Sequence, residues 1–81
     1  MIIKWGEPKR QANIAKHRID FADIGEEFFA SALIGDAKDG RYFALGEWNG
    51  FIVVIFVRLG SEGVSIVSAR PASRKERKLL S

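Results

Sequence analysis

The fold is decided by residues 41–59, RYFALGEWNGFIVVIFVRL, which predict a β-hairpin at the centre of a sheet. Asn49-Gly50 is the strongest short hairpin signal, because a type I′ turn requires positive φ at both of its central residues. The flanking residues therefore predict two antiparallel strands, Arg41–Trp48 and Phe51–Leu59. The second strand is apolar on both faces from residue 51 to residue 57, which is typical of a central strand covered on each side.

Downstream of this hairpin, the sequence predicts a last strand and a short basic helix. A polar turn at residues 60–63 leads into a strand at Val64–Arg70. Pro71 ends that strand, because proline has no N–H and restricts the residue before it. Ser73 and Glu76 have the Ser-x-x-Glu spacing of a capping box, which fixes the start of the helix.

Upstream of the hairpin, the sequence predicts a short strand and two helices. Ile2–Trp5 is the strand, and the first helix spans Glu7–His17, with Pro8 at an early position where its missing N–H is harmless. Asp20 caps a second helix. Its apolar residues recur at i, i+3, i+7 and i+8 and form a core-facing stripe: Phe21, Ile24, Phe28 and Phe29.

With a further strand at Ala32–Asp36, the predicted order of elements is β-α-α-β-β-β-β-α. Helices that are segregated from hairpins indicate an α+β fold. We expect an antiparallel sheet packed with two N-terminal helices and a short C-terminal helix. The 81 residues form a single domain, 1–81, with one modest core.

The composition excludes several classes of protein. A hydrophobic content of 47% excludes a disordered chain. The absence of cysteine fits a reducing cytosol and excludes a disulfide scaffold or a zinc–thiolate site. The longest apolar run is far too short to span a membrane, and no secretory signal opens the chain. We therefore expect a cytoplasmic protein that does not engage a membrane.

The formal net charge of +3 is unevenly distributed along the chain. Residues 1–18 and residues 68–81 each carry five cations against one acid, a net charge of +4. The residues between them carry −5. If the two ends meet in space, they form a surface for a polyanion; the alternative is ordinary solubilising charge.

The Asn49-Gly50 turn also predicts which residues face each other in the hairpin. With a two-residue loop, Arg41 lies opposite Arg58 on one face of the sheet. Like charges directly opposed across two strands are destabilising. The pair therefore indicates either a clamp for an anion such as phosphate or two side chains splayed into water.

The first helix carries a polar face, because Lys9, Asn13, Lys16 and His17 have spacings that place them together. This face is either a solvated stripe, a catalytic surface, or a half-buried seam in which Asn13 and His17 are structural hydrogen-bonding groups.

The last helix carries Arg74 and Lys75 in its first turn, where the helix dipole disfavours cations. Free N–H groups and two cations suit an anion such as phosphate. The alternative is a solvated terminal helix.

The residue types favour chemistry without a metal or a cofactor. A single histidine rules out a two-histidine ribonuclease mechanism, and no cluster of His, Asp or Glu has metal-ligand spacing. Arginines, lysines and His17, with Glu76 or Tyr42 as further candidates, suit RNA cleavage by its own 2′-hydroxyl. That reaction requires a positioned phosphate, stabilisation of developing charge and proton transfer.

A pattern of residues spans nearly the whole chain. It consists of Trp5, Lys9-x-x-x-Asn13-x-x-Lys16-His17, Phe21, Arg41, Gly46, Arg58 and Ile66-Val67-Ser68-Ala69-Arg70-x-Ala72-Ser73-x-x-Glu76-Arg77. This pattern resembles the BrnT toxins of bacterial type II toxin–antitoxin modules. The combination of an early Lys-His motif with a late Ser-Ala-Arg motif is specific, although each half alone is weak.

The resemblance implies a RelE-like fold and a metal-independent endoribonuclease toxin that cleaves RNA and inhibits translation and growth. It also implies neutralisation by a BrnA-like antitoxin, whose ribbon-helix-helix dimer would be the only contact with operator DNA. The catalytic candidates are His17, Arg41, Arg58, Arg70, Glu76 and Arg77. The RNA-binding candidates are Lys9, Lys16, Arg74 and Lys75.

In this interpretation, Arg41 and Arg58 hold the scissile phosphate, and Arg70 with Arg77 binds RNA or a second phosphate. The strand register places Arg70 away from Arg58, so we do not expect all the arginines to converge. A residue other than these four arginines would transfer the protons.

His17 or Glu76 would move protons in such a reaction.

Three residues depart from the family pattern: Gly6 replaces an aspartate, Arg18 replaces a glycine that ends the first helix, and Leu80 replaces a tyrosine. The competing interpretation is a non-catalytic module that binds RNA or an antitoxin.

Overall fold

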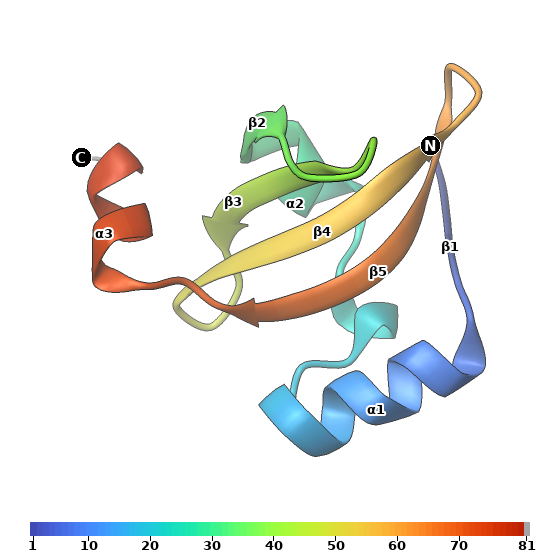
Figure 1. Ribbon diagram of the computed structural model, residues 1–81, viewed down its shortest axis with the longest axis horizontal. Coiled ribbons are helices and arrows are strands. Elements are labelled where there is room, and N and C mark those ends of the chain that lie inside the picture. Colours follow the sequence, from blue (N-terminus) through green and yellow to red (C-terminus); the bar gives the residue numbers. More distant parts are fainter. Residues whose placement is uncertain (81) are drawn as a thin grey trace.

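The computed structural model describes residues 1–80, whose arrangement is shown in Figure 1. In chain order the elements are β1 (Ile2–Trp5), α1 (Glu7–His17), the 3₁₀ turn η1 (Phe21–Asp23), α2 (Glu26–Ser31), β2 (Leu33–Asp36), β3 (Tyr42–Glu47), β4 (Phe51–Leu59), β5 (Gly63–Pro71), α3 (Arg74–Arg77) and the 3₁₀ turn η2 (Lys78–Leu80). The predicted α+β class is confirmed, and every predicted strand lies within one residue of an observed strand at both ends.

The five strands form one sheet in the order β1-β5-β4-β3-β2. Strands β2 to β5 pair as antiparallel neighbours, but β1 pairs in parallel with β5, with Ile2 opposite Gly63 and Trp5 opposite Ile66. The predicted antiparallel pairing is therefore confirmed for β2 to β5, but the sheet as a whole is mixed because β1 joins it in parallel. Most of the chain separates β1 from β5, so no local turn in the sequence indicates that they pair.

The second predicted helix, which begins after Asp20, is divided in the structure. Asp20 caps only η1, where its side chain accepts a hydrogen bond of 2.9 Å from the Ala22 N–H. Gly25 is extended, and α2 begins after it at Glu26. Glycine weakens a helix interior by about 0.5–1 kcal/mol relative to alanine, which gives a physical reason for the break. The apolar stripe of this segment is buried, so its predicted core role is confirmed.

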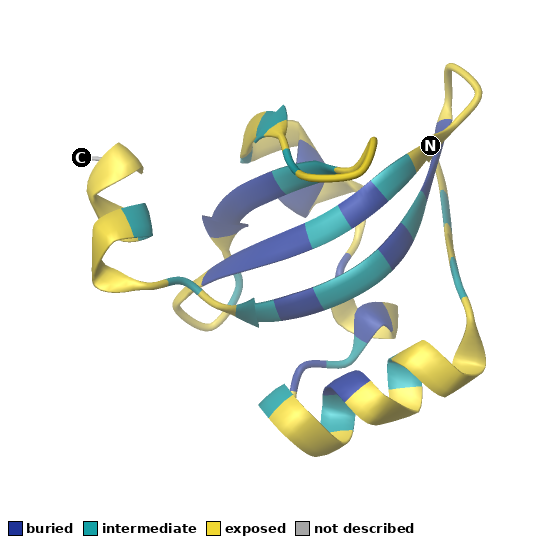
Figure 2. Ribbon diagram, viewed as in Figure 1, coloured by how far each residue is buried: buried dark blue, intermediate teal, exposed yellow. Residues whose placement is uncertain are grey.

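The main hydrophobic core lies between the sheet and the η1–α2 segment, as Figure 2 shows by the buried residues on the central strands. Phe29 packs edge-to-face against Phe28 at 5.5 Å and against Phe56 at 5.4 Å between ring centroids. On the opposite face of the sheet, Leu45 and Val53 face each other and are also buried. Strand β4 is therefore covered on both faces, as predicted.

The hairpin that joins β3 to β4 has a three-residue loop, so the prediction of a two-residue loop is wrong. Glu47 pairs with Phe51, and the Trp48 N–H donates to the Gly50 carbonyl at 2.7 Å. Asn49 and Gly50 do have positive φ angles, 51° and 105°. The sequence therefore locates the turn correctly, but the extra loop residue shifts the register by one.

This shift removes the predicted opposition of Arg41 and Arg58. Tyr42 pairs with Phe56. Arg58 is two residues after Phe56 and therefore lies on the same face of the sheet as this pair. Arg41 is one residue before Tyr42 and therefore lies on the other face. A slip of one residue moves every side chain of a strand to the other side of the sheet. The paired-arginine clamp derived from the two-residue loop is therefore wrong.

Arg18 ends α1 in the left-handed conformation, with φ 59° and ψ 30°, and its N–H donates to the Ile14 carbonyl at 2.8 Å. A residue with a Cβ pays roughly 1–2 kcal/mol in this conformation. Glycine adopts it freely and is the usual residue at such a helix end. The backbone of this chain therefore keeps a glycine conformation at a position that carries arginine.

Arg18→Gly should raise the free energy of unfolding by about 1 kcal/mol, because glycine removes the steric cost at this φ. Arg18→Ala is the matched control, since it removes the same charge but keeps a Cβ and should give no gain. Urea unfolding followed by tryptophan fluorescence measures both. Equal stabilisation by the two variants would assign the effect to charge and contradict this explanation.

Candidate functional site

A groove of ≈ 370 Å³ lies between α1, which forms one wall, and the second half of β5, which forms the other. Its lining residues are Lys9, Ala12, Asn13, Lys16, His17, Val67, Ser68 and Arg70. Four of the residues predicted for the site meet here: Lys9, Lys16, His17 and Arg70. Two cations of the first basic end, Lys9 and Lys16, therefore meet one cation of the second, Arg70, which gives part of the surface that a polyanion requires.

Asn13 fixes α1 against β5. Strand β1 stops pairing at Trp5 opposite Ile66, so the Ala69 N–H lies beyond the end of that strand. The Asn13 Oδ1 accepts a hydrogen bond of 3.0 Å from this N–H, and its Nδ2 donates to the Ile19 carbonyl at 2.9 Å. Asn13 is only 6% exposed. The interpretation of Asn13 as a structural hydrogen-bonding group at a buried seam is therefore confirmed.

Helix periodicity then places three cationic or titratable side chains beside Asn13 over the groove. Lys9 and His17 lie four residues before and after it, and Lys16 lies three residues after it, so all share its face. His17 is half-buried, whereas both lysines are exposed. Within residues 1–80, none of these three side chains forms an ion pair with an acid. The charge of the two lysines therefore faces the groove without internal neutralisation.

Arg70 is held at the other wall by two hydrogen bonds of 2.8 Å to the Glu76 carboxylate. Glu76 also accepts from the Ser73 N–H at 2.8 Å, and the Ser73 Oγ accepts from the Glu76 N–H at 3.1 Å, so the predicted capping box is confirmed. These bonds, that from Arg70 foremost, lower the pKa of Glu76 to about 2. Such a carboxylate is ionised at neutral pH and is a weak base, so it suits orienting Arg70 better than moving protons.

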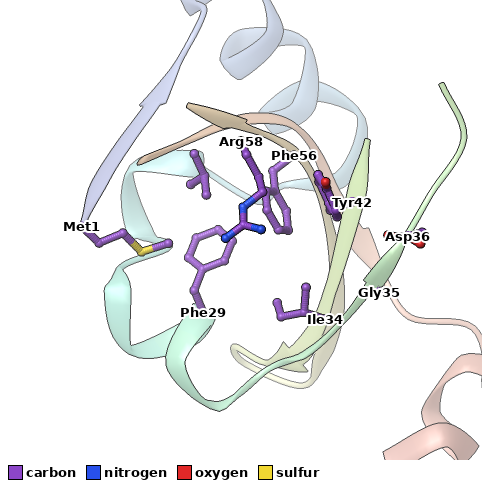
Figure 3. A pocket seen from close by; sticks show the side chains of 9 residues that line it. Met1, Phe29, Ile34, Gly35, Asp36, Tyr42, Phe56 and Arg58 are labelled. Carbon is purple, nitrogen blue, oxygen red and sulfur yellow. The ribbon is translucent and has the colours of Figure 1, made fainter. Parts of the chain in front are cut away.

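Arg58 lies in a different part of the molecule. It is at the end of β4 beside Tyr42, as Figure 3 shows, and it pairs across the sheet with Val64 at the start of β5. Arg70 pairs with Val53, near the opposite end of β5. The expected separation of Arg58 from Arg70 is confirmed.

The remaining predicted residues are outside the groove lining. Arg41 directly precedes β3, and Arg74, Lys75 and Arg77 are exposed on α3. A contact between these residues and RNA stays a prediction.

Arg10 and Asp20 form a second arginine–carboxylate pair with two hydrogen bonds, like that of Arg70 and Glu76. The sequence alone indicates only part of this arrangement. The Arg10 Nε and Nη2 donate to the two Asp20 carboxylate oxygens at 2.7 and 2.9 Å. Arg10 also donates to Glu7 at 2.7 Å, and this i, i+3 spacing is readable from the sequence. Hydrogen bonding, chiefly from Arg10, lowers the pKa of Asp20 to about 2. The pair fixes the chain after α1, so Arg10 is engaged in the fold.

The sequence profile of a family described as "Ribonuclease toxin, BrnT, of type II toxin-antitoxin system" matches residues 5–76. The chain belongs to the BrnT family. It is therefore a ribonuclease toxin of a type II toxin–antitoxin system, with RNA as its target and an antitoxin as its partner.

A solved BrnT structure supports the same conclusion. The 1.1 Å crystal structure of the Brucella abortus ribonuclease toxin BrnT is 53% identical and matches with a TM-score of 0.84. The match covers 91% of this chain and 99% of that one. No curated protein sequence matches the chain significantly.

Two further observations concern the described part of this BrnT-family chain. No helix within residues 1–80 is both long enough and apolar enough to cross a membrane. No group of three or more His, Asp or Glu side chains among these residues is placed to hold a metal ion.

Asn13→Ala should lower the free energy of unfolding by about 1–3 kcal/mol, because it leaves the Ala69 N–H and the Ile19 carbonyl without their partner. Gln11→Ala, at an exposed position of the same helix, is the control and should change stability by no more than about 0.5 kcal/mol. Urea unfolding compares them. Equal losses would show that the Asn13 bridge does not hold α1 on the sheet.

The Glu76 carboxylate should stabilise the fold at neutral pH and lose this effect in acid. Its pKa in the fold, about 2, lies below its ordinary value of 4.5, so the unfolded chain takes up the proton first. The stabilisation is therefore complete above about pH 4.5 and fades as the pH falls toward 2.

Glu76→Gln should consequently unfold at lower urea concentration than the parent at pH 7, and the difference should narrow at pH 3. Glu47→Gln, which removes an exposed carboxylate that has no ion-pair partner within residues 1–80, should give a small difference at both pH values. A Glu76→Gln difference that stays constant between pH 7 and pH 3 would contradict the role of the ionised carboxylate.

Proposed function

We propose that the chain cleaves RNA in the groove between α1 and β5, without a metal, by attack of the 2′-hydroxyl on the adjacent phosphate. In this proposal cleavage takes place in the cytoplasm and inhibits translation and growth. A BrnA-like antitoxin of the ribbon-helix-helix type neutralises the toxin and alone contacts operator DNA. We also retain the RelE-like assignment of the fold as part of this proposal.

The observation that carries the proposal is the meeting of Lys9, Lys16, His17 and Arg70 in one groove. A phosphodiester needs cations to stabilise the charge that develops in the transition state. The two lysines supply charge from α1, and the guanidinium supplies directed hydrogen bonds from β5. The donor set therefore suits phosphate chemistry by charge and hydrogen bonding.

Arg70 keeps hydrogen-bond donors for a substrate even though Glu76 holds it. A guanidinium has five N–H donors. Two hydrogen bonds go to Glu76, and a longer one, at 3.3 Å, goes to the Pro71 carbonyl. The remaining N–H groups are available to a phosphate oxygen, and the carboxylate fixes the plane in which they lie. Glu76 is therefore a positioning residue in this proposal.

His17 is the proton-transferring residue in this proposal. Histidine is the side chain that most readily gains and loses a proton near neutral pH. His17 lies in the last turn of α1 and lines the groove with Arg70. Arg74, Lys75 and Arg77 on α3 extend the cationic surface beyond Arg70 and would contact the RNA strand outside the scissile phosphate.

His17→Gln and Arg70→Gln should each slow cleavage of a fluorescently labelled RNA oligonucleotide by about 10²–10⁴-fold, the usual effect of removing a proton-transfer or transition-state group. Lys4→Gln is the matched control, because it removes an exposed cation of β1 outside the groove and should keep the parental rate. Addition of EDTA should leave the rate of the parent unchanged.

Cleavage that survives both groove substitutions would place the reaction elsewhere. Binding of RNA that weakens steeply with salt, with no cleavage by the parent, would instead identify a non-catalytic RNA-binding module.

A further inference from the structure

A hollow of ≈ 300 Å³ lies at the end of the sheet where β4 finishes, on the face that carries the main core. Buried Phe29, Phe56 and Val64 line it with Tyr42, and Met1, Ile34 and Asp36 contribute its exposed rim. Asp36 forms no ion pair with Arg58. Figure 3 shows the Arg58 guanidinium over this hollow, between the aromatic rings and the side chains of Met1 and Ile34. We call this site the Arg58 hollow.

Arg58 has no acidic partner within residues 1–80, in contrast to Arg10 and Arg70. Its guanidinium carbon lies 5.8 Å from the centroid of the Tyr42 ring, which places the charge over an aromatic face. Apolar walls lower the local dielectric, so an incoming carboxylate would interact with this cation more strongly than it would in open water. The hollow therefore fits a ligand that presents an aliphatic group beside a negative charge.

The rings of the hollow are poorly placed to stack on a nucleobase. Phe29 and Phe56 are 8% and 4% exposed and are already in edge-to-face contact. Tyr42 stacks on Phe56 at 5.8 Å with an angle of 27° between the rings. Bases bind single-strand platforms through exposed aromatic faces, whereas Phe29 and Phe56 are buried and Tyr42 is contacted by Phe56 and Arg58.

The exposed residues that line the hollow are the apolar Met1 and Ile34 and the charged Arg58 and Asp36. Met1 is 50% exposed and Ile34 is 47% exposed. Clustered exposed apolar side chains are typical of protein–protein contact surfaces. Arg58 of β4 is the cation of this lining and Asp36 of β2 is its acid, so the surface matches a protein segment that carries an aliphatic residue close to an acid, with the acid toward Arg58.

We propose that the Arg58 hollow docks an aliphatic–acidic segment of the antitoxin, with a carboxylate on Arg58 and an aliphatic side chain between Met1 and Ile34. This inference rests on the proposed function in one respect, because it assigns RNA cleavage to the groove between α1 and β5. Val64, opposite Arg58, and Arg70 lie six positions apart along β5. At about 3.3 Å per residue they lie roughly 20 Å apart along the strand. The antitoxin segment and the scissile phosphate therefore occupy separate sites.

The test measures antitoxin affinity and RNA cleavage separately, with the product of the gene adjacent to the toxin gene as the probe. Arg58→Gln and Ile34→Ser should each weaken its binding at least 10-fold in titration calorimetry. Ile34→Ser should keep the parental rate of RNA cleavage, so its expression should arrest growth even when the antitoxin is co-expressed. Lys38→Gln is the control for loss of an exposed cation and should bind the antitoxin like the parent.

Unchanged antitoxin affinity in both variants would overturn the assignment of the Arg58 hollow to the antitoxin. Loss of RNA cleavage in Arg58→Gln with normal antitoxin binding would also overturn it, because that result would assign Arg58 to the RNA site. A toxin dimer in sedimentation that Ile34→Ser dissociates would assign the hollow to a second copy of the chain and would also overturn it. Failure of the parent to cleave RNA would refute the proposed function, while the affinity measurement would still test the hollow.

Discussion

The hydrogen bonds of Asn13 are the constraint on which the groove depends. Strand β5 continues beyond the end of β1, so its edge has a backbone N–H at Ala69 that no strand satisfies. The amide of Asn13 accepts from that group and donates to the chain that leaves α1, at Ile19. A buried side chain with both functions satisfied sets the position of a helix closely, because an unmade hydrogen bond in the interior is costly. The four-residue spacing of Lys9 and His17 from Asn13 then carries them to the same wall.

The arginines differ in whether a carboxylate of the chain holds them, and this difference indicates different roles. Arg10 and Arg70 are each held by a carboxylate through two hydrogen bonds, so their positions are fixed by the fold. The pair of Arg10 with Asp20 fixes the loop after α1, whereas Arg70 lines the groove. Arg58 has no such partner within the described residues and lies over an apolar hollow. A paired guanidinium suits a precise contact with a small anion, and an unpaired one suits a partner that brings its own acid.

Local signals in the sequence predicted most of the elements. The capping box of Ser73 and Glu76, the positive φ angles at Asn49 and Gly50, and the apolar stripe of the second helical segment were readable because each depends on near neighbours. The parallel pairing of β1 and the hydrogen bond from Ala69 to Asn13 depend on residues more than fifty positions apart and left no local signal. A single extra loop residue at Trp48 overturned the register, and with it the opposition of Arg41 and Arg58.

Whether RNA binds between α1 and β5 can be measured by locating an oligonucleotide bound to the chain. Backbone amide NMR shifts would be followed while the chain is titrated with an RNA whose 2′-hydroxyls are replaced by hydrogen, so that it binds without being cleaved. RNA bound in this groove should cause the largest shifts at residues 9–17 and 67–70, which form its two walls. Shifts confined to β3 and β4 around Arg41 and Arg58, with these walls unchanged, would contradict binding in the groove.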